Sequence, residues 1–135
     1  MDKISKERRS ENMRRIRSKD TKPELAVRRL VHSLGYRYRL HRKDLPGKPD
    51  LVFGPKRKVI FVHGCFWHGH DDPKCVDGRL PKSNLGYWKT KIARNRERDQ
   101  ARQRELKDLG WDALVIWDCE TTDQATLAAK INSFL

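Results

Sequence analysis

The sequence contains no long apolar run, and none of its apolar segments approaches the roughly 18 residues that a helix needs to cross a bilayer. Its amino terminus also lacks the apolar stretch of a secretory signal. These absences predict a soluble, cytoplasmic protein that does not bind membranes. Internal repeats and low-complexity linkers are absent as well, and a length of 135 residues fits one compact domain with a single core.

Cysteine is scarce. The chain has 3 cysteines, an odd number that cannot be paired completely within one chain. Disulfides are also disfavoured in a reducing cytosol. Metal ligation is therefore the interpretation of these cysteines that needs testing.

Acidic residues are outnumbered, since 18 Asp and Glu stand against 31 Lys and Arg, which gives a net charge of +13 and a pI near 10.1. A field of this strength attracts polyanions, so nucleic acid is the first candidate partner; a ribosomal or otherwise merely adhesive basic protein is the alternative. Residues 1–43 hold 15 Lys and Arg against 5 Asp and Glu, which predicts that they lie along phosphates. We expect residues 1–20 to form a basic arm that only DNA orders, ahead of a folded domain at 21–135.

Apolar spacing and turn residues predict an α/β fold with the element order αβββαβα. The predicted strands cover residues 36–40, 50–53, 59–62 and 113–117, and the predicted helices cover 21–34, 88–109 and the region of Leu127, Ile131 and Phe134. Residues 64–87 form a long irregular stretch, whose length in so small a domain suggests function or a metal tie. The second helix carries a basic run, which is either another contact face or a solvated helix surface.

The first helix begins with the residues Thr21, Lys22, Pro23 and Glu24, a pattern typical of a capping box with proline in the first turn. The cap alone explains a glutamate at this position. Glu24 can still face a metal site if the start of the helix lies beside Asp50.

A dense cluster of histidine and cysteine follows the third predicted strand. Cys65, His70, Cys75 and Cys119 make a Cys₃His set, a common composition for a tetrahedral structural zinc site. Such a site would fasten the irregular stretch to the last strand and add folding free energy. His68 is an alternative to His70 as the fourth ligand. Three buried free cysteines that pack as small hydrophobic groups are the alternative to a metal site.

A second set of residues fits phosphodiester cleavage. Asp50 opens one predicted strand and His63 ends the next, so a hairpin would bring the two side chains near one another. A carboxylate there suits Mg²⁺, which polarises a phosphoryl oxygen, and His63 or His68 suits proton transfer near neutral pH. Taken alone, the aspartate is better explained as a turn residue after proline, and each histidine as an ordinary surface or core residue. Only the three residues together favour catalysis.

Phe66 and Trp67 form an adjacent aromatic pair among polar residues. Exposed, they would act as a wedge that unstacks base pairs, and Met13 in the basic arm is a second candidate wedge. The alternative is that these side chains belong to the core.

These residues together resemble the very short patch repair (Vsr) mismatch endonucleases, relatives of the PD-(D/E)xK nucleases. The resemblance covers nearly the whole chain and rests on six stretches: Arg9–Met13, Leu45–Asp50, Val59–His68, Trp88–Ile92, Asn95–Asp99 and Val115–Cys119. The string His-Gly-Cys-Phe-Trp-His after Pro-Gly-Lys-Pro-Asp is its most specific part. The usual (D/E)xK element is replaced by Phe61-Val62-His63, a departure that belongs to the family. The implied fold is a single restriction-endonuclease-like domain with a mixed central sheet flanked by helices.

The resemblance also implies roles for individual residues. Asp50 would bind Mg²⁺ together with the backbone carbonyl of Val62, and Glu24 would hydrogen-bond to water on the metal. His68 would transfer the proton, and His63 would contact the region of the scissile phosphate. The implied zinc ligands are Cys65, His70, Cys75 and Cys119, and the implied DNA-contacting residues are Met13, Phe66, Trp67, Trp88 and Lys91.

The substrate that this resemblance implies is duplex DNA with a T:G mismatch left by deamination of 5-methylcytosine, nicked on the 5′ side of the thymine. We expect a monomer at the nucleoid, with a functional link to a cytosine-5 DNA methyltransferase and to repair proteins. Two alternatives remain: a zinc-stabilised DNA-binding module without catalysis, and a restriction-type nuclease that cuts matched DNA.

Overall fold

A computed structural model of the chain describes residues 21–40, 42–70, 75, 80 and 82–135. Its helices and strands are α2 (Lys22–Ser33), β1 (Arg39–Leu40), β2 (Leu51–Phe53), β3 (Lys58–His63), α3 (Leu85–Asp108), β4 (Asp112–Trp117) and α4 (Gln124–Phe134). The predicted order αβββαβα is confirmed. The arm predicted at residues 1–20, with Met13, lies outside the described residues.

The strands form one four-stranded sheet in the order β1-β2-β3-β4. β1 and β3 each pair antiparallel with β2, whereas β3 and β4 run parallel, so the predicted mixed sheet is confirmed. Parallel strands need a long crossover, which α3 supplies here. As a result, His63 and Trp117 face each other in register at the same end of the sheet.

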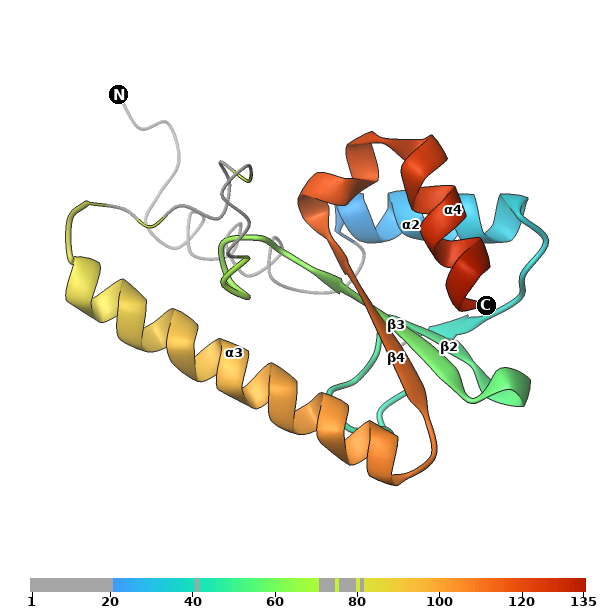
Figure 1. Cartoon of the computed structure of the whole chain (residues 1–135), viewed down its shortest axis with the longest axis horizontal. Coiled ribbons are helices and arrows are strands. Elements are labelled where there is room, and N and C mark those ends of the chain that lie inside the picture. Colours follow the sequence, from blue (N-terminus) through green and yellow to red (C-terminus); the bar gives the residue numbers. More distant parts are fainter. Residues whose placement is uncertain (1–20, 41, 71–74, 76–79, 81) are drawn as a thin grey trace, which may run out of the picture.

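Helices cover both faces of the sheet, which explains the apolar strand sequences (Figure 1). On one face, α2 and α4 pack through residues such as Val27 and Ile131 against Ile60 and its neighbours. On the other face, Leu106 of α3 packs against side chains that include Val59. Alternate residues of β3 therefore enter two different core clusters, and the strand that leads to the site is held from both sides.

Two predicted features differ from the structure. The strand expected at residues 36–40 is reduced to Arg39–Leu40, because the tyrosines before it bond to helices instead. The hydroxyl of Tyr36 donates to Asn132 Oδ1 at 2.9 Å, and that of Tyr38 donates to the carbonyl of Arg28 at 3.4 Å. The capping box is also wrong, since Thr21 makes no side-chain capping hydrogen bond.

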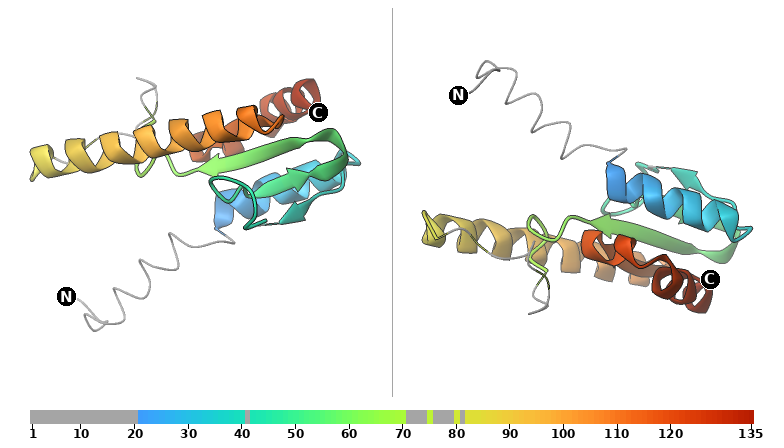
Figure 2. Two further views of the ribbon diagram at one scale, coloured as in Figure 1. Left: turned by 90° about the horizontal axis from the view of Figure 1, so that it is seen from below. Right: turned by 90° about the horizontal axis from the view of Figure 1, so that it is seen from above.

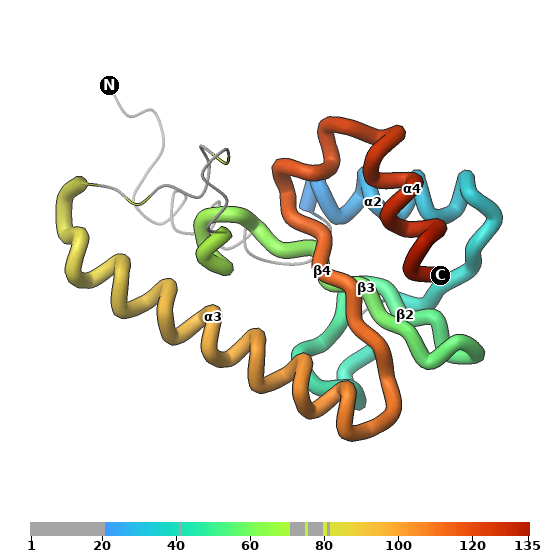
Figure 3. Tube along the Cα trace, viewed as in Figure 1, coloured from blue at the N-terminus to red at the C-terminus, as the bar shows by residue number. Residues whose placement is uncertain are grey.

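The amino-terminal half of α3 extends beyond the end of β3 (Figure 2). The segment that follows β3 folds back beside this half of the helix (Figure 3), and Asn95 Nδ2 donates to the carbonyl of Trp67 at 2.9 Å. The site residues after β3 are thereby fixed against α3. Among the residues that the structure describes, no helix is both long and apolar enough to span a membrane.

Candidate active site and metal centre

Asp50 stands immediately before β2, beside the end of β3. Its backbone N–H donates to the carbonyl of Ile60 at 3.1 Å, and its Oδ2 accepts the backbone N–H of Val62 at 2.6 Å. Because β2 and β3 are antiparallel, the start of one strand meets the end of the other. The Asp50 side chain is thus anchored to the backbone of β3 at Val62, the residue before His63.

Glu24 of α2 lies next to Asp50. Its side chain is buried, at 3% exposure, and forms a carboxyl-carboxyl hydrogen bond with Asp50. Arg28 Nη2 donates to Glu24 Oε2 at 2.6 Å. The helix start therefore directs Glu24 towards Asp50, where the sequence alone favoured a cap.

Burial and the neighbouring Glu24 carboxyl raise the pKa of Asp50 to about 8, against the lowering effect of the Val62 N–H. Two carboxyl groups in contact and partly shielded from water are stable when they share a proton or a cation. The oxygen donors of Asp50 and Glu24 suit a hard divalent cation. This pair fits the metal that the sequence pattern predicts.

Three further side chains, His63, His68 and Asp99, form a group that begins one residue after Val62. The rings of His63 and His68 stack at 3.9 Å between centroids with an interplanar angle of 6°. His68 Nδ1 lies 2.6 Å from Asp99 Oδ2, a carboxylate supplied by α3. Asp99 therefore fixes the orientation of the His68 ring and leaves its Nε2 directed elsewhere.

His63 is held in the neutral form. Burial and the nearby His68 lower its pKa to about 4, although the Asp99 charge acts in the opposite direction. A neutral imidazole still offers one N–H donor. His63 can thus donate a hydrogen bond to an anionic oxygen without carrying charge.

A separate cluster gathers Cys65, His70, Cys75 and Cys119, with ligand atoms that all lie within 4.8 Å of one another. His70 Nδ1 is 3.5 Å from Cys119 Sγ, and the backbone N–H of Cys119 donates to Cys65 Sγ at 3.5 Å. Burial raises the pKa of the Cys65 and Cys119 thiols. A bound cation would supply the charge that makes them thiolates, so the donor set fits a metal.

Trp117 joins the two clusters. Its ring stacks on His70 at 4.3 Å with an interplanar angle of 12°, and it meets His63 edge-on at 5.4 Å. The strand register explains this position, because Trp117 is opposite His63 in the parallel pairing of β3 and β4. One indole thus packs against both a candidate metal ligand and a candidate active-site histidine.

Comparison with known proteins agrees with this geometry. A family profile described as DNA mismatch endonuclease Vsr matches residues 1–74. The type II nicking enzyme V.XorIIP of Xanthomonas oryzae pv. oryzae (strain KACC10331 / KXO85) is 54% identical over 134 residues, which cover 99% of this chain and 96% of that protein. The chain belongs to the Vsr family of DNA mismatch endonucleases. The DNA mismatch endonuclease Vsr of Escherichia coli (strain K12) is 40% identical over 111 residues, 82% of this chain and 69% of that protein.

This Vsr-family endonuclease places most of the predicted site residues in two groups at one end of the sheet. Asp50 and Glu24 belong to the first, with the backbone of Val62, and His63, which follows Val62 in β3, stacks on His68. The choice between His68 and His70 as a companion of the cysteines is also decided by position. His70 lies with the cysteines, and His68 pairs with Asp99.

The predicted DNA-contacting aromatics also come together in the Vsr-family chain. Phe66, Trp67 and Trp88 lie edge to face, with centroids 5.0 to 5.9 Å apart, and all three are half-buried. Tyr87 extends the cluster at 5.0 Å from Trp88 and is 60% exposed. Lys91 is half-buried on α3, and Met13 lies outside the described residues.

Sequence reasoning missed Asp99. It lies within the stretch Asn95–Asp99 that carried part of the family resemblance, yet a single acidic residue in a charged helix looks like a solvated side chain. The available signal was its position on the long helix that follows the histidine-rich segment. One face of such a helix can lie against that segment and present a side chain to it. The pairing with His68 spans 31 positions and depends on the fold.

Proposed function

We propose that this endonuclease nicks duplex DNA on the 5′ side of the thymine in a T:G mismatch, as the first step of very short patch repair. The observation that supports this best is the His68–Asp99 pair beyond the end of β3, the strand in which the backbone of Val62 holds Asp50. Histidine held by a carboxylate next to a metal-binding aspartate suits phosphodiester hydrolysis. The T:G substrate rests on membership in a family whose Escherichia coli relative is named a mismatch endonuclease.

His68 is the proposed proton-transfer residue. Asp99 accepts a hydrogen bond from Nδ1–H, which leaves Nε2 free to take a proton from the attacking water. His63, stacked on His68 and neutral, donates its N–H to an oxygen of the scissile phosphate. Asp99 is a positioning residue, because it acts through His68.

Asp50 and the backbone carbonyl of Val62 are the proposed ligands of Mg²⁺, with Glu24 alongside. When bound, the ion supplies charge stabilisation at the phosphoryl and leaving oxygens. Because its pKa is raised, Asp50 would have to give up a proton in order to hold the ion. Glu24 remains hydrogen-bonded to Arg28 and supplies a second negative charge at the site.

Zinc is the proposed ion of the cysteine cluster, with a structural role. Three thiols and one imidazole match the soft donors and tetrahedral number that zinc prefers. All four ligands come from the protein, as in closed structural sites. The ion would tie the segment after β3 to the turn after β4.

Phe66, Trp67 and Trp88 form the proposed wedge at the mismatch, together with Met13, and Lys91 lies near a phosphate. A mismatched pair is already weakly stacked, so a wedge enters there at lower cost. We infer that residues 1–20 form a DNA-contacting arm ahead of an endonuclease domain at 21–135. We also propose a monomer that acts in the cytoplasm at the nucleoid, functionally linked to a cytosine-5 methyltransferase and repair proteins.

Parallel digestion of T:G and fully matched duplexes tests the proposal. Each strand carries its own end label, and reactions run with and without Mg²⁺. We expect one nick, 5′ to the mismatched thymine, only with Mg²⁺. Equal cutting of the matched duplex indicates a restriction-type nuclease, and binding without any cut indicates a DNA-binding module. Asp50→Ala controls for contaminating nucleases, since it should bind without nicking.

A further inference from the structure

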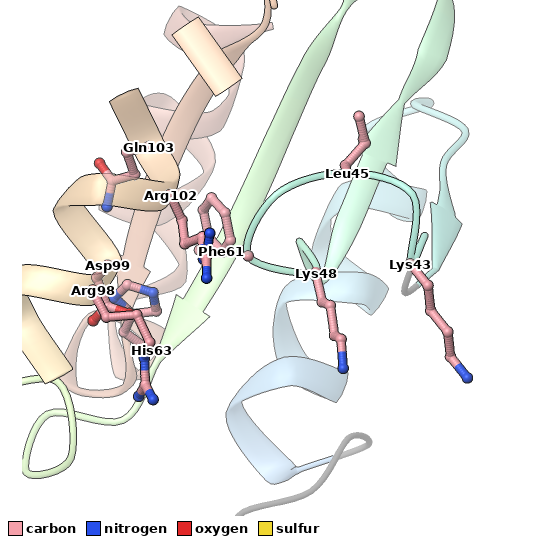
Figure 4. Close-up of a pocket in the computed structure, with 10 residues that line it drawn as sticks. Lys43, Leu45, Lys48, Phe61, His63, Arg98, Asp99, Arg102 and Gln103 are labelled. Carbon is pink, nitrogen blue, oxygen red and sulfur yellow. The ribbon is translucent and has the colours of Figure 1, made fainter. Parts of the chain in front are cut away.

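A cavity of about 500 Å³ opens beside the His68–Asp99 pair, between the turn before β2 and the middle of α3 (Figure 4). Lys43 and Lys48 line it from the turn, and Arg98 and Arg102 line it from α3. His63 and Asp99 form the end of the cavity that joins the proposed active site. We call this cavity the basic groove.

The shape of the basic groove is fixed by close packing. Gly47 has φ +79, and a Cβ there would lie 3.1 Å from Arg102 Cβ and 3.2 Å from the ring of Phe61. The turn backbone therefore rests directly on the stem of Arg102, which sets the distance between the two walls. The next residue, Lys48, has the uncommon left-handed φ of 49°. Its backbone N–H donates to the carbonyl of Leu45 at 3.3 Å, which closes the turn.

The charge in the basic groove is unbalanced. Four cations line it against one carboxylate, that of Asp99, which is engaged with His68. Arg102 pairs with Glu105 at 3.0 Å, but both side chains are 47% exposed, and an exposed pair of this kind contributes little to stability. Buried Phe61 and Leu45 form an apolar floor, which strengthens the field of the cations above it.

We propose that the basic groove binds a backbone phosphate of the nicked strand, adjacent to the phosphate that is cut, with Lys48 and Arg102 as its main donors. The inference rests on the proposed function. Lysine and arginine are the usual phosphate donors, and an uncharged ligand would leave the excess positive charge of the groove unbalanced. His63 lines one end of the groove. A DNA strand that placed its scissile phosphate at His63 would therefore place the adjacent phosphate in the groove.

Charge removal with retention of side-chain length provides the first test. Lys48→Gln and Arg102→Gln should each weaken binding of a T:G duplex about three- to tenfold and lower the slope of log K against log salt by about 1. Arg104→Gln is the matched control, because Arg104 lies about 200° around α3 from Arg102 and is exposed.

Replacing single phosphates by uncharged methylphosphonate identifies the contact. In the wild-type protein, replacing one phosphate adjacent to the nick should lower the DNA affinity at least fivefold. In the variant with both Lys48→Gln and Arg102→Gln, the same linkage should cost less than twofold. Equal thermal stability of the two proteins excludes a folding defect.

The inference would be overturned if every methylphosphonate lowered the affinity of the double variant as much as that of the wild type. It would also be overturned if Arg104→Gln weakened binding as much as Lys48→Gln or Arg102→Gln. The proposed function would survive that result as long as wild-type protein still nicks the T:G duplex. Failure of the wild-type protein to nick would instead refute the proposed function, with the binding measurements still valid for the groove.

Discussion

Asp50 is held in an electrostatic setting that serves function at a cost in stability. It lies half-buried beside Glu24, and its pKa is raised to about 8, so the folded protein retains a proton there that the unfolded chain releases above about pH 4. That retained proton favours the folded state at low pH. The benefit is lost as the pH rises through about 8, where the two carboxylates repel one another without a cation.

Asp50→Asn should therefore stabilise the metal-free protein while it abolishes nicking. Asparagine can accept the Val62 N–H and donate to Glu24 without charge. In chelated buffer near neutral pH we expect an increase of at least about 1 kcal/mol in the free energy of unfolding, growing up to about pH 8. Denaturant unfolding at several pH values measures it. A destabilised variant at every pH would contradict the assigned pKa.

Trp117 makes a second prediction at the level of single residues. Trp117→Phe retains an aromatic ring between His70 and His63, whereas Trp117→Ala removes both contacts. We expect the alanine variant to lose at least about tenfold in single-turnover nicking and the phenylalanine variant to lose much less. Trp111→Phe is the control outside the site, where the ring contacts Arg42.

DNA affinity and bound metal must be measured beside the nicking rate of these variants. A positioning role lowers the rate with affinity retained. If Trp117→Ala nicks as fast as Trp117→Phe, the indole does not position His63.

The segment between β3 and α3 shows how elements position the site. Gly69 has φ +66, and a Cβ there would come within 2.5 Å of Ile92 and 2.6 Å of Arg96 on α3. The backbone of this segment is therefore in direct contact with the helix that carries Asp99. A displaced segment would separate His68 from its partner.

Gly69→Ala tests this contact between elements. We expect a loss of about 2 kcal/mol or more in stability, from backbone strain and overpacking, together with slower nicking. Gly86→Ala is a matched change in the first turn of α3, where an added Cβ meets nothing within 4 Å, and it should leave stability unchanged or slightly higher. Thermal denaturation compares the two. Equal stability of both variants would contradict the close packing at Gly69.

Local sequence patterns predicted the elements better than their contacts. The apolar runs of β2, β3 and β4 and the Gly35 and Gly110 helix ends were evident because each depends on neighbouring residues. The capping box at Thr21 failed because Glu24 bonds across space to Asp50 and Arg28. Asp99 was missed for the same reason, whereas the Cys and His cluster was found because its residue types are rare elsewhere in the chain.

For the whole molecule, the cysteine cluster joins the segment after β3 to the turn after β4. Removal of the metal by a strong chelator should lower the melting temperature by several degrees and abolish nicking, since both His70 and Trp117 lose their support. Metal analysis of protein purified without added metal should show one zinc per chain. Unchanged melting after chelation, with no zinc found, would indicate free cysteines that merely pack.

The proposed role of His68, which Asp99 orients, is to transfer the proton when one DNA strand is cut. The most direct test is the single-turnover nicking rate of a T:G duplex at saturating protein for His68→Ala and Asp99→Asn, with DNA affinity measured in parallel. We predict a loss of about 100-fold or more for His68→Ala, a smaller but clear loss for Asp99→Asn, and affinities within about threefold of wild type. Near-normal nicking by His68→Ala would contradict the claim.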